Sequence, residues 1–208
     1  MKTQRYAQLT EELGRMTCRQ IVEIGTWNGA RARELASAAL RRSGAVSYHG
    51  FDLFEDLTPE LLEEELSKQP PSQQEVEAGL KRFQRRIRLV PWRRGSFDFA
   101  LHRGFTRETL PAFRAANPDY RADFVWIDGG HKVETIAGDW EQCSAMLAPD
   151  GVIYLDDMYG NEELATEFGC NQLIARLERD PEWQVAVLPA TDTFPEIGSI
   201  QIARVRRV

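Results

Sequence analysis

Short apolar segments alternate with longer segments of helical composition along most of this 208-residue chain. The apolar segments are rich in Val, Ile, Phe and Tyr and have the length of strands, so the alternation predicts βαβ units and a mostly parallel sheet. We expect seven strands, at residues 21–24, 47–52, 87–91, 124–128, 152–156, 184–188 and 200–204.

The connections between these strands indicate their directions. Residues 31–42 are rich in Ala and Leu, which predicts a helix between the first two strands. The last two strands are joined by residues 189–199, too few for a helical crossover, so we expect this pair to be antiparallel. The predicted fold class is α/β, with helices on both faces of a mostly parallel sheet whose last strand is antiparallel.

Two further segments have helical patterns. Residues 58–85 follow the second strand and are highly charged. They form either a solvated helical pair or a lid, because ligands of such sheets bind beyond the carboxyl ends of the strands. The N-terminal segment, residues 1–20, contains another expected helix, for packing or as a second part of a lid. Without repeats or a linker, we expect residues 1–208 to form a single domain.

Composition narrows the class of protein. The 26 basic and 32 acidic residues give a net charge of −6, which argues against a broad surface for nucleic acid or anionic membrane. Cys18, Cys143 and Cys170 have no metal or disulfide spacing. No apolar run resembles a signal peptide or approaches the ~18 residues of a membrane span. We expect a cytoplasmic protein with a small-molecule partner and neither nucleic acid nor membrane; a homodimer is compatible with these features.

A glycine turn follows the first strand, in the sequence VEIGTWNG at residues 22–29. The Rossmann fingerprint G-x-G-x-x-G has a middle glycine that lets the backbone approach a diphosphate. Here Gly25 and Gly29 are separated by three residues that include Thr26 and Trp27, so the middle glycine is missing. The turn therefore favours a ligand without a diphosphate.

Asp52 ends the second strand, in the sequence HGFDL. A carboxylate there could accept hydrogen bonds from both hydroxyls of a ribose. Asp52 follows Gly29 by roughly the ~20 residues that separate the loop and the ribose acid in nucleotide-binding βαβ units. The alternative is that Asp52 caps the next helix. Asp52 and its neighbour Leu53 are candidate cofactor-binding residues.

Acidic residues also end the fourth and fifth strands. FVWIDGGH places Asp128 after the fourth strand, and YLDD places Asp156 and Asp157 after the fifth. Neighbouring strands lie about 5 Å apart, so the three carboxylates would converge beside the glycine turn. Such crowding requires protonation or a cation, and oxygen ligands suit Mg²⁺, with Mn²⁺ or Ca²⁺ as alternatives. Otherwise Asp128 contacts the cofactor, and Asp156 and Asp157 only cap the following helix.

The E-x-G-x-x-x-G turn, the D-G-G-H sequence, the L-x-P-x-G-V-I segment and the double Asp together resemble class I S-adenosylmethionine-dependent methyltransferases. They are most similar to metal-dependent small-molecule O-methyltransferases, notably the macrocin-type sugar methyltransferases, over roughly residues 21–159. The resemblance implies a Rossmann-like fold and a turn that passes under the methionine part of the cofactor. It also implies that Glu23 supports this turn or meets the methionine ammonium through water.

The resemblance implies further site residues. Gly95 and Ser96, in the loop after the expected third strand, would contact the adenine edge, unless this loop is a simple turn. Asp128, Asp156 and Asp157 would hold Mg²⁺. Catechol-type relatives have Asp, Asp and Asn at these positions, so a catechol acceptor is not implied. A related β-lactam hydroxylase family shares the same outline.

His131 is the leading candidate for the general base, because a neutral imidazole can take a hydroxyl proton near pH 7. A purely structural role is the alternative, and Lys132 would need a strongly lowered pKa to replace it. Asp128 is the second catalytic candidate. Trp27 either packs over a ligand or belongs to the core. Substrate contacts or capping roles are expected for Tyr159, Asn161 and Asn171.

We predict an S-adenosylmethionine-dependent O-methyltransferase that acts on a hydroxyl of a sugar, polyol or phenolic metabolite, with Mg²⁺ activating the hydroxyl. Two alternatives remain. A nicotinamide-dependent oxidoreductase is disfavoured by the missing middle glycine and by the absence of a Tyr-x-x-x-Lys pair. A catalytically silent methyltransferase-like module would bind a partner through residues 58–85.

Overall fold

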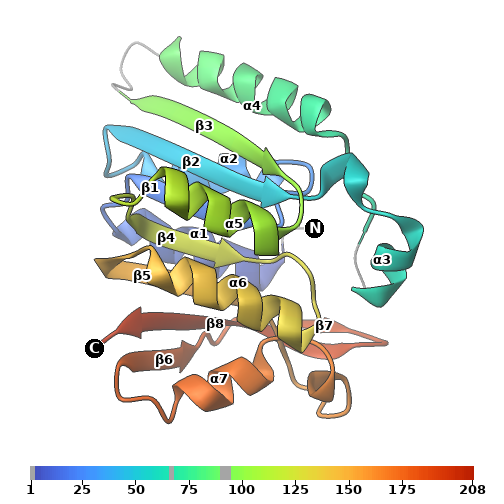
Figure 1. Ribbon diagram of the computed structural model, residues 1–208. Helices are drawn as coiled ribbons and strands as arrows, with labels where there is room; N and C mark the ends of the chain where they lie inside the picture. Colours follow the sequence, from blue (N-terminus) through green and yellow to red (C-terminus); the bar gives the residue numbers. More distant parts are fainter. Residues whose placement is uncertain (1–2, 66–67, 90–94) are drawn as a thin grey trace.

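The structure, a computed structural model, describes residues 3–65, 68–89 and 95–208. Its strands form one sheet in the order β3-β2-β1-β4-β5-β8-β6, with the short strand β7 paired to β8 (Figure 1). Strands β1 to β5 are parallel, and β8 is antiparallel to β5, β6 and β7. The strands are β1 (Gln20–Ile24), β2 (Ala45–Asp52), β3 (Ser96–Arg103), β4 (Ala122–Ile127), β5 (Leu147–Tyr159), β6 (Trp183–Val187), β7 (Asp192–Phe194) and β8 (Gly198–Arg207).

Helices cover both faces of this sheet (Figure 1). One apolar cluster joins α1, α2 and α4 to one face, and a second cluster joins α5, α6 and α7 to the other. The helices are α1 (Gln4–Arg15), α2 (Ala30–Ala39), α3 (Pro59–Glu64), α4 (Gln73–Arg88), α5 (Thr106–Ala116), α6 (Val133–Ala145) and α7 (Asn171–Leu177), with short 3₁₀ turns at Phe54–Asp56 and Leu164–Thr166. The predicted α/β class is confirmed.

Alternation along the strands divides the core between the two faces. In β4, Phe124 and Trp126 belong to the first cluster, whereas Val125 and Ile127 belong to the second. Successive side chains of a strand point to opposite faces, so a strand covered on both faces must be apolar throughout. This explains the continuous apolar runs in the sequence and places polar side chains where the strands end.

The prediction of the third strand at residues 87–91 is wrong. Ile87 is buried in the last turn of α4, β3 begins at Ser96, and residues 90 and 91 lie outside the described part of the chain. The capping box of Ser72 and Glu75 starts a helix whose apolar face runs on to Ile87. Helix α4 is therefore the crossover between the parallel strands β2 and β3, and α3 is the additional element.

The C-terminal strands agree with the expected antiparallel pairing, since β6 and β8 are antiparallel neighbours. The connection between them contains β7, which was not expected and brings the sheet to eight strands among the described residues.

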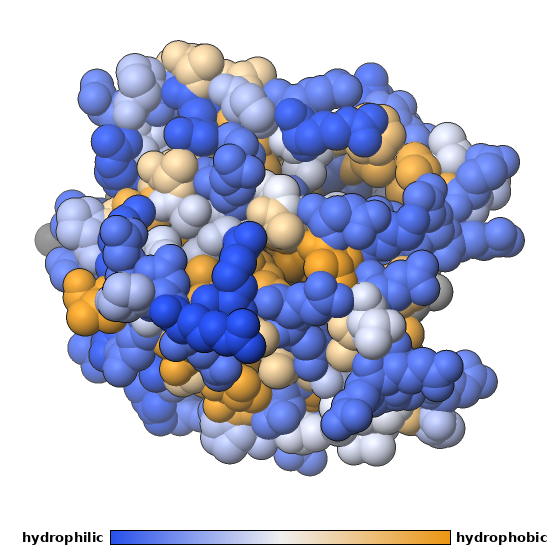
Figure 2. Space-filling view, turned by 60° about the horizontal axis from the view of Figure 1, so that its bottom comes forward, coloured by the Kyte–Doolittle hydropathy of each residue, from blue (hydrophilic) through white to orange (hydrophobic). Residues whose placement is uncertain are grey.

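On the face drawn in Figure 2, hydrophobic residues form small patches among hydrophilic ones. Among the described helices, none has the length and apolarity that a bilayer span requires.

Candidate functional site

A cleft of about 1080 Å³ lies beyond the carboxyl ends of the central strands. Pockets for small ligands usually have roughly 300–1,000 Å³, so this cleft has room for more than one ligand group. In Figure 1, α3 lies on the side of the sheet to which the arrows of β2, β3 and β4 point. The glycine turn, the end of β2, the Asp128 loop, α3 and the first turn of α1 all contribute to the lining.

The glycine turn forms a backbone floor for the cleft. Gly25 has φ of +85°, and a Cβ atom added to it would lie 1.9 Å from the carbonyl oxygen of Asp128. A side chain at this position would therefore separate the turn from the end of β4. Gly29 and Trp27 also have positive φ, so the chain reverses sharply before α2 begins at Ala30.

Glu23 supports this turn from below and does not line the cleft. Its side chain is fully buried and accepts a hydrogen bond from the Tyr48 hydroxyl, which lies 3.3 Å from Thr26 Oγ1. Burial raises the pKa of Glu23 to about 8, against the opposing effect of the Tyr48 hydrogen bond. Gly50 makes room for this chain of contacts, because a Cβ there would lie 2.4 Å from Thr26 Oγ1. The geometry agrees with a supporting role for Glu23.

Asp52 lies at the end of β2 and lines the cleft with Leu53. Its Oδ2 accepts a hydrogen bond of 2.7 Å from the Trp27 amide, and its Oδ1 accepts one of 2.7 Å from the Phe54 amide. Each carboxylate oxygen still has a lone pair for another donor. Asp52 thus joins the turn to the next segment and keeps the capacity to accept ribose hydroxyls.

Gly95 and Ser96 do not lie at this site, which corrects their expected adenine contact. Ser96 pairs with Ala45 at the start of two parallel strands, at the opposite edge of the sheet from the cleft. The other predicted loop residues, 92–94, lie outside the described part of the chain. Because β3 begins nine residues later than expected, the segment that lines the cleft after this strand is 104–107.

Asp128, His131 and Asp157 form an acidic cluster at the mouth of β4 and β5. Each offers one ligand atom, and these atoms lie within 4.8 Å of one another. A register shift in β5 and a φ of +59° at Asp157 turn its carboxylate toward His131, whose Nε2 lies 3.2 Å from Asp157 Oδ2. His131 Nδ1 lies 2.5 Å from the carbonyl oxygen of Glu65, a contact that requires the proton on Nδ1. Nε2 of the neutral ring and the carboxylate are then both acceptors, so a proton or a cation must be shared between them.

Burial and mutual repulsion make this cluster a proton-binding or cation-binding centre. Burial raises the pKa of Asp128 well above its ordinary value, and the charges of Asp156 and Asp157 add to the shift. Burial and Asp156 raise the pKa of Asp157 to about 6, whereas His131 opposes the change. The same two carboxylates would be ionised by a bound divalent ion.

Asp156, the third predicted metal residue, lies close to these groups but is not part of the cluster, because other side chains engage its carboxylate. Its carboxylate is 2% exposed and forms two hydrogen bonds of 2.8 Å with the Arg5 guanidinium. The Tyr6 hydroxyl donates a hydrogen bond of 2.7 Å to the same carboxylate. Sequence reasoning missed Arg5 and Tyr6, because they lie more than 100 residues before Asp156 and belong to no motif.

Helix α3 closes one side of the cleft. Glu65, directly after α3, accepts hydrogen bonds from the Lys132 amide at 2.9 Å and from Thr135 Oγ1 at 2.7 Å. Trp27 is 46% exposed, which excludes its core alternative, and its indole Nε1 donates to the carbonyl oxygen of Gln69 at 3.2 Å. The first part of the charged segment, around α3, therefore lines the cleft, whereas α4 in its second part packs against one face of the sheet.

The three residues beyond the double Asp have different places. Tyr159 lines the cleft. The Asn171 side chain hydrogen-bonds to the backbone N–H and carbonyl of Tyr159 and so holds this residue in position. Asn161 caps the following turn through the amides of Glu163 and Leu164.

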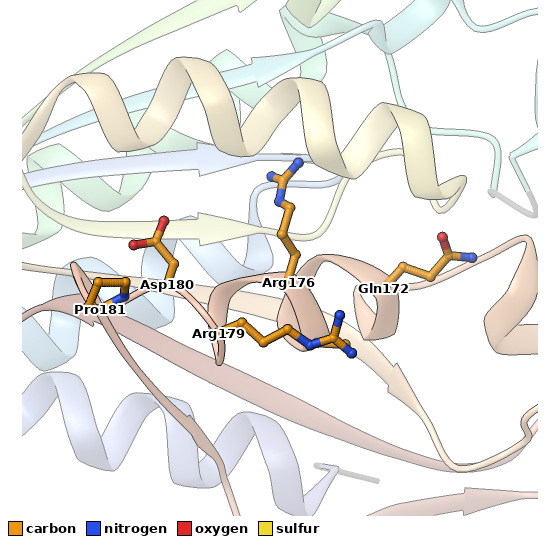
Figure 3. Close-up of a pocket in the computed structure, with 6 residues that line it drawn as sticks. Gln172, Arg176, Arg179, Asp180 and Pro181 are labelled. Carbon is orange, nitrogen blue, oxygen red and sulfur yellow. The ribbon is translucent and has the colours of Figure 1, made fainter.

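A second, more open depression of about 600 Å³ follows α7 (Figure 3). It is lined by Gln172, Ala175, Arg176, Arg179, Asp180 and Pro181. The labelled side chains follow α7 and the turn after it in Figure 3, and the lining shares no residue with the cleft. This depression plays no part in the site at the carboxyl edge of the sheet.

Comparisons with known proteins agree with this geometry. The family model described as "Methyltransferase domain" matches residues 22–158. An O-methyltransferase from Bacillus cereus, solved with S-adenosylhomocysteine, has a TM-score of 0.67 at 13% identity; all of this chain and 82% of that chain are covered. The O-methyltransferase TomG from Streptomyces achromogenes, solved with S-adenosylmethionine, has a TM-score of 0.66 at 11% identity, with coverage of 100% and 81%.

A third similar structure is CalS11, a TDP-rhamnose 3′-O-methyltransferase in calicheamicin biosynthesis. Its TM-score is 0.60 at 18% identity, and 95% of this chain and 76% of that chain are covered. No curated protein sequence matches the chain. The family match covers well over half of the chain and the fold agrees throughout. The chain therefore belongs to the methyltransferase domain family, and it shares the fold of these O-methyltransferase structures.

Proposed function

We propose that this protein transfers a methyl group from S-adenosylmethionine to a hydroxyl oxygen of a small metabolite, and that a divalent cation, Mg²⁺ or Mn²⁺, activates the hydroxyl. The observation that carries the proposal is the shared position of two features. The glycine turn and the acidic cluster of Asp128, His131 and Asp157 line one cleft, and the Asp128 backbone packs directly under Gly25. A methyl donor on the turn would therefore lie beside groups that can take up a hydroxyl proton.

The residues present fit both ligands. Gly25, Thr26 and Trp27 would lie under the methionine part of the cofactor, and Asp52 and Leu53 would face its ribose. The segment 104–107, which lines the cleft after β3, would contact the adenine in place of Gly95 and Ser96. Asp128 and Asp157 would hold the cation, since Mg²⁺ is usually bound through one or two carboxylates, with water and substrate oxygens filling the other positions.

The chemistry needs alignment and one proton acceptor. The bound cofactor supplies a methyl group on a cationic sulfur, and transfer breaks this C–S bond, forms a C–O bond and releases the hydroxyl proton. His131 is oriented for the proton, because Glu65 accepts from its Nδ1 and makes Nε2, which lies 3.2 Å from Asp157 Oδ2, the acceptor atom of the ring. Most of the acceleration would come from holding the acceptor oxygen in line with the methyl group.

The acceptor side of the cleft has a mixed lining. Leu57, Leu61, Phe194, Ile197 and Ile200 supply apolar surface, and Tyr159 adds a hydroxyl. This lining suits a small hydroxyl compound with an apolar face, which includes both phenolic metabolites and deoxysugars. The structural similarity to a TDP-rhamnose methyltransferase supports the sugar class.

Calorimetric titration tests the cofactor assignment. We expect S-adenosylhomocysteine to bind and NAD to leave the heat signal unchanged, because the turn lacks the glycine that admits a diphosphate. Asp52→Ala should weaken S-adenosylhomocysteine binding by about tenfold or more, since it loses the ribose acceptor and the contact to the Trp27 amide. Binding of NAD with no binding of S-adenosylhomocysteine would refute the assignment.

Methyl transfer to a panel of sugars, polyols and phenols, followed by mass spectrometry, tests the reaction. A chelator should abolish the transfer and Mg²⁺ or Mn²⁺ should restore it. Transfer that persists in the chelator would remove the cation from the proposal and leave the acceptor chemistry intact. Cofactor binding without transfer to any acceptor of these classes would favour the catalytically silent alternative.

A further inference from the structure

The first turn of α1 reaches the acidic cluster from the far end of the sequence. Arg5 and Tyr6 line the cleft and contact Asp156, which lies about 150 residues later in the chain. Figure 1 marks the N-terminus at the side of the sheet where α3 lies. Farther along α1, Leu9 and Leu13 are fully buried in the core, so the helix is firmly packed.

Arg5 and Asp156 form a buried, bidentate ion pair. Arg5 Nε donates to Asp156 Oδ1 and a terminal guanidinium nitrogen donates to Oδ2, both at 2.8 Å, and the two residues are 6% and 2% exposed. Arg5 also reaches Asp192 of β7 at 3.3 Å. A fork of this kind fixes the plane of the carboxylate and neutralises its charge in a site of low dielectric. A divalent cation on Asp156 would meet the guanidinium at short range.

Tyr6 lies between Asp156 and the cluster. The single proton of its hydroxyl is shared between two acceptors, Asp156 Oδ2 at 2.7 Å and, more weakly, Asp128 Oδ2 at 3.4 Å. The ring is held from two sides, with the Arg31 guanidinium 3.8 Å from its centroid and the edge of Trp126 packed against it. The hydroxyl is therefore fixed between two carboxylates, only one of which belongs to the cation cluster.

We propose that Asp156 anchors the N-terminal helix and is not a metal ligand, and that Tyr6 is a positioning residue that holds the Asp128 carboxylate for the cation. This inference rests on the proposed function, because it assigns roles around its cation site. It departs from the ligand set that the family resemblance implied, in which all three aspartates hold Mg²⁺. The Arg5 fork and the Tyr6 hydroxyl engage both oxygens of Asp156, whereas Asp128 and Asp157 face His131 and the cleft.

The test is a titration with Mn²⁺, followed by electron paramagnetic resonance, on the full chain and four variants. Asp157→Ala, which has no side-chain oxygen, serves as the reference for a lost ligand and should abolish binding. Asp156→Asn should bind Mn²⁺ within about threefold of the wild type while unfolding at a lower temperature. Tyr6→Phe keeps the stacked ring and loses the hydroxyl, so it should weaken binding by about tenfold, as the loss of an outer hydrogen bond to a metal ligand usually does.

A paired replacement guards against misfolding of Asp156→Asn. In Arg5→Met with Asp156→Leu, both buried charges are removed together, which avoids leaving a single buried charge. This double variant should retain Mn²⁺ binding if Asp156 is an anchor and lose it if Asp156 is a ligand.

Two results would overturn the inference. The first is loss of Mn²⁺ binding in the double variant as complete as in Asp157→Ala, and the second is wild-type affinity in Tyr6→Phe. Absence of Mn²⁺ binding by the wild-type chain would also overturn it, along with the cation site. S-adenosylhomocysteine binding, measured in the absence of Mn²⁺, reports on the methyltransferase assignment separately and should stay within about twofold in all variants.

Discussion

Glu23 shows how one buried carboxyl group can support a ligand loop without touching the ligand. The group has no direct route to solvent, and its only partner among the described residues is the Tyr48 hydroxyl, which in turn lies near Thr26. Its pKa of about 8 means that the neutral acid is the form favoured by the fold near pH 7. The strength of this support therefore depends on pH.

We predict that Glu23→Gln removes a pH-dependent part of the stability. The pKa of Glu23 rises from 4.5 to about 8 on folding, so its contribution is fully present below pH 4.5 and is lost as the pH rises through 8. Each pH unit in this window costs up to about 1.4 kcal/mol. Gln imitates the neutral acid, so urea unfolding should show little difference at pH 5 and a more stable variant at pH 8.5. Glu11→Gln, at an exposed carboxylate of α1, is the control; an equal change in both variants would contradict the prediction.

At the scale of elements, α3 is attached to the rest of the site by a few polar contacts. The Glu65 side chain accepts hydrogen bonds from the Lys132 amide and Thr135 Oγ1. The backbone carbonyl oxygen of Glu65 accepts a hydrogen bond from His131 Nδ1. Few other contacts hold this segment, because α3 contains no fully buried residue. A ligand under α3 can leave only when these contacts open.

Glu65→Ala should therefore speed the exchange of S-adenosylhomocysteine. Two side-chain hydrogen bonds are lost, each worth about 0.5–1.5 kcal/mol, so we expect dissociation about tenfold faster in stopped-flow fluorescence of the nearby Trp27. The matched control is Glu63→Ala, an exposed residue of α3 for which no contact with the Lys132 segment is described. Equal rates in the two variants would show that Glu65 does not hold the lid.

The elements whose apolar runs are buried on both faces of the sheet could be predicted from the sequence. Strands β1, β2, β4, β5, β6 and β8 all lie where the apolar runs are. The third strand could not be placed, because the apolar residues at 87, 89 and 90 come at the end of a basic helix that has no helix-ending glycine. The local pattern does not separate a last helical turn from a strand. The misplaced adenine contact at Gly95 and Ser96 followed from this one shift.

The acidic cluster shows a second limit of prediction from the sequence. The sequence predicts that Asp128, Asp156 and Asp157 meet at the ends of β4 and β5, and they do lie close together. It does not predict which carboxylate is neutralised by a distant residue, because Arg5 belongs to an amphipathic helix whose docking is decided by packing against α2. Residues so far apart in the sequence form no local motif from which their contact could be predicted.

At the scale of the whole molecule, Asp128 connects the two ligand sites of the cleft. Its backbone lies under the Gly25 turn, where the methyl donor would bind, and its carboxylate belongs to the cation cluster. A ligand that immobilises one part of Asp128 lowers the conformational entropy that is lost when the other ligand binds. The sites should therefore be coupled, in the direction of mutual strengthening.

We predict that Mn²⁺ and S-adenosylhomocysteine raise each other's affinity by the same factor, about fivefold or more. Calorimetry should give this factor twice, once from Mn²⁺ titrations with and without S-adenosylhomocysteine and once from the reverse pair. Equality of the two factors is required by linkage and checks the measurement, whereas their size tests the role of Asp128. Asp157→Ala, which lacks a ligand oxygen for the cation, should bind S-adenosylhomocysteine with the wild type's cation-free affinity at every Mn²⁺ concentration. Independent binding in the wild type, with both factors near one, would mean that the turn and the acidic cluster act as separate sites within one cleft.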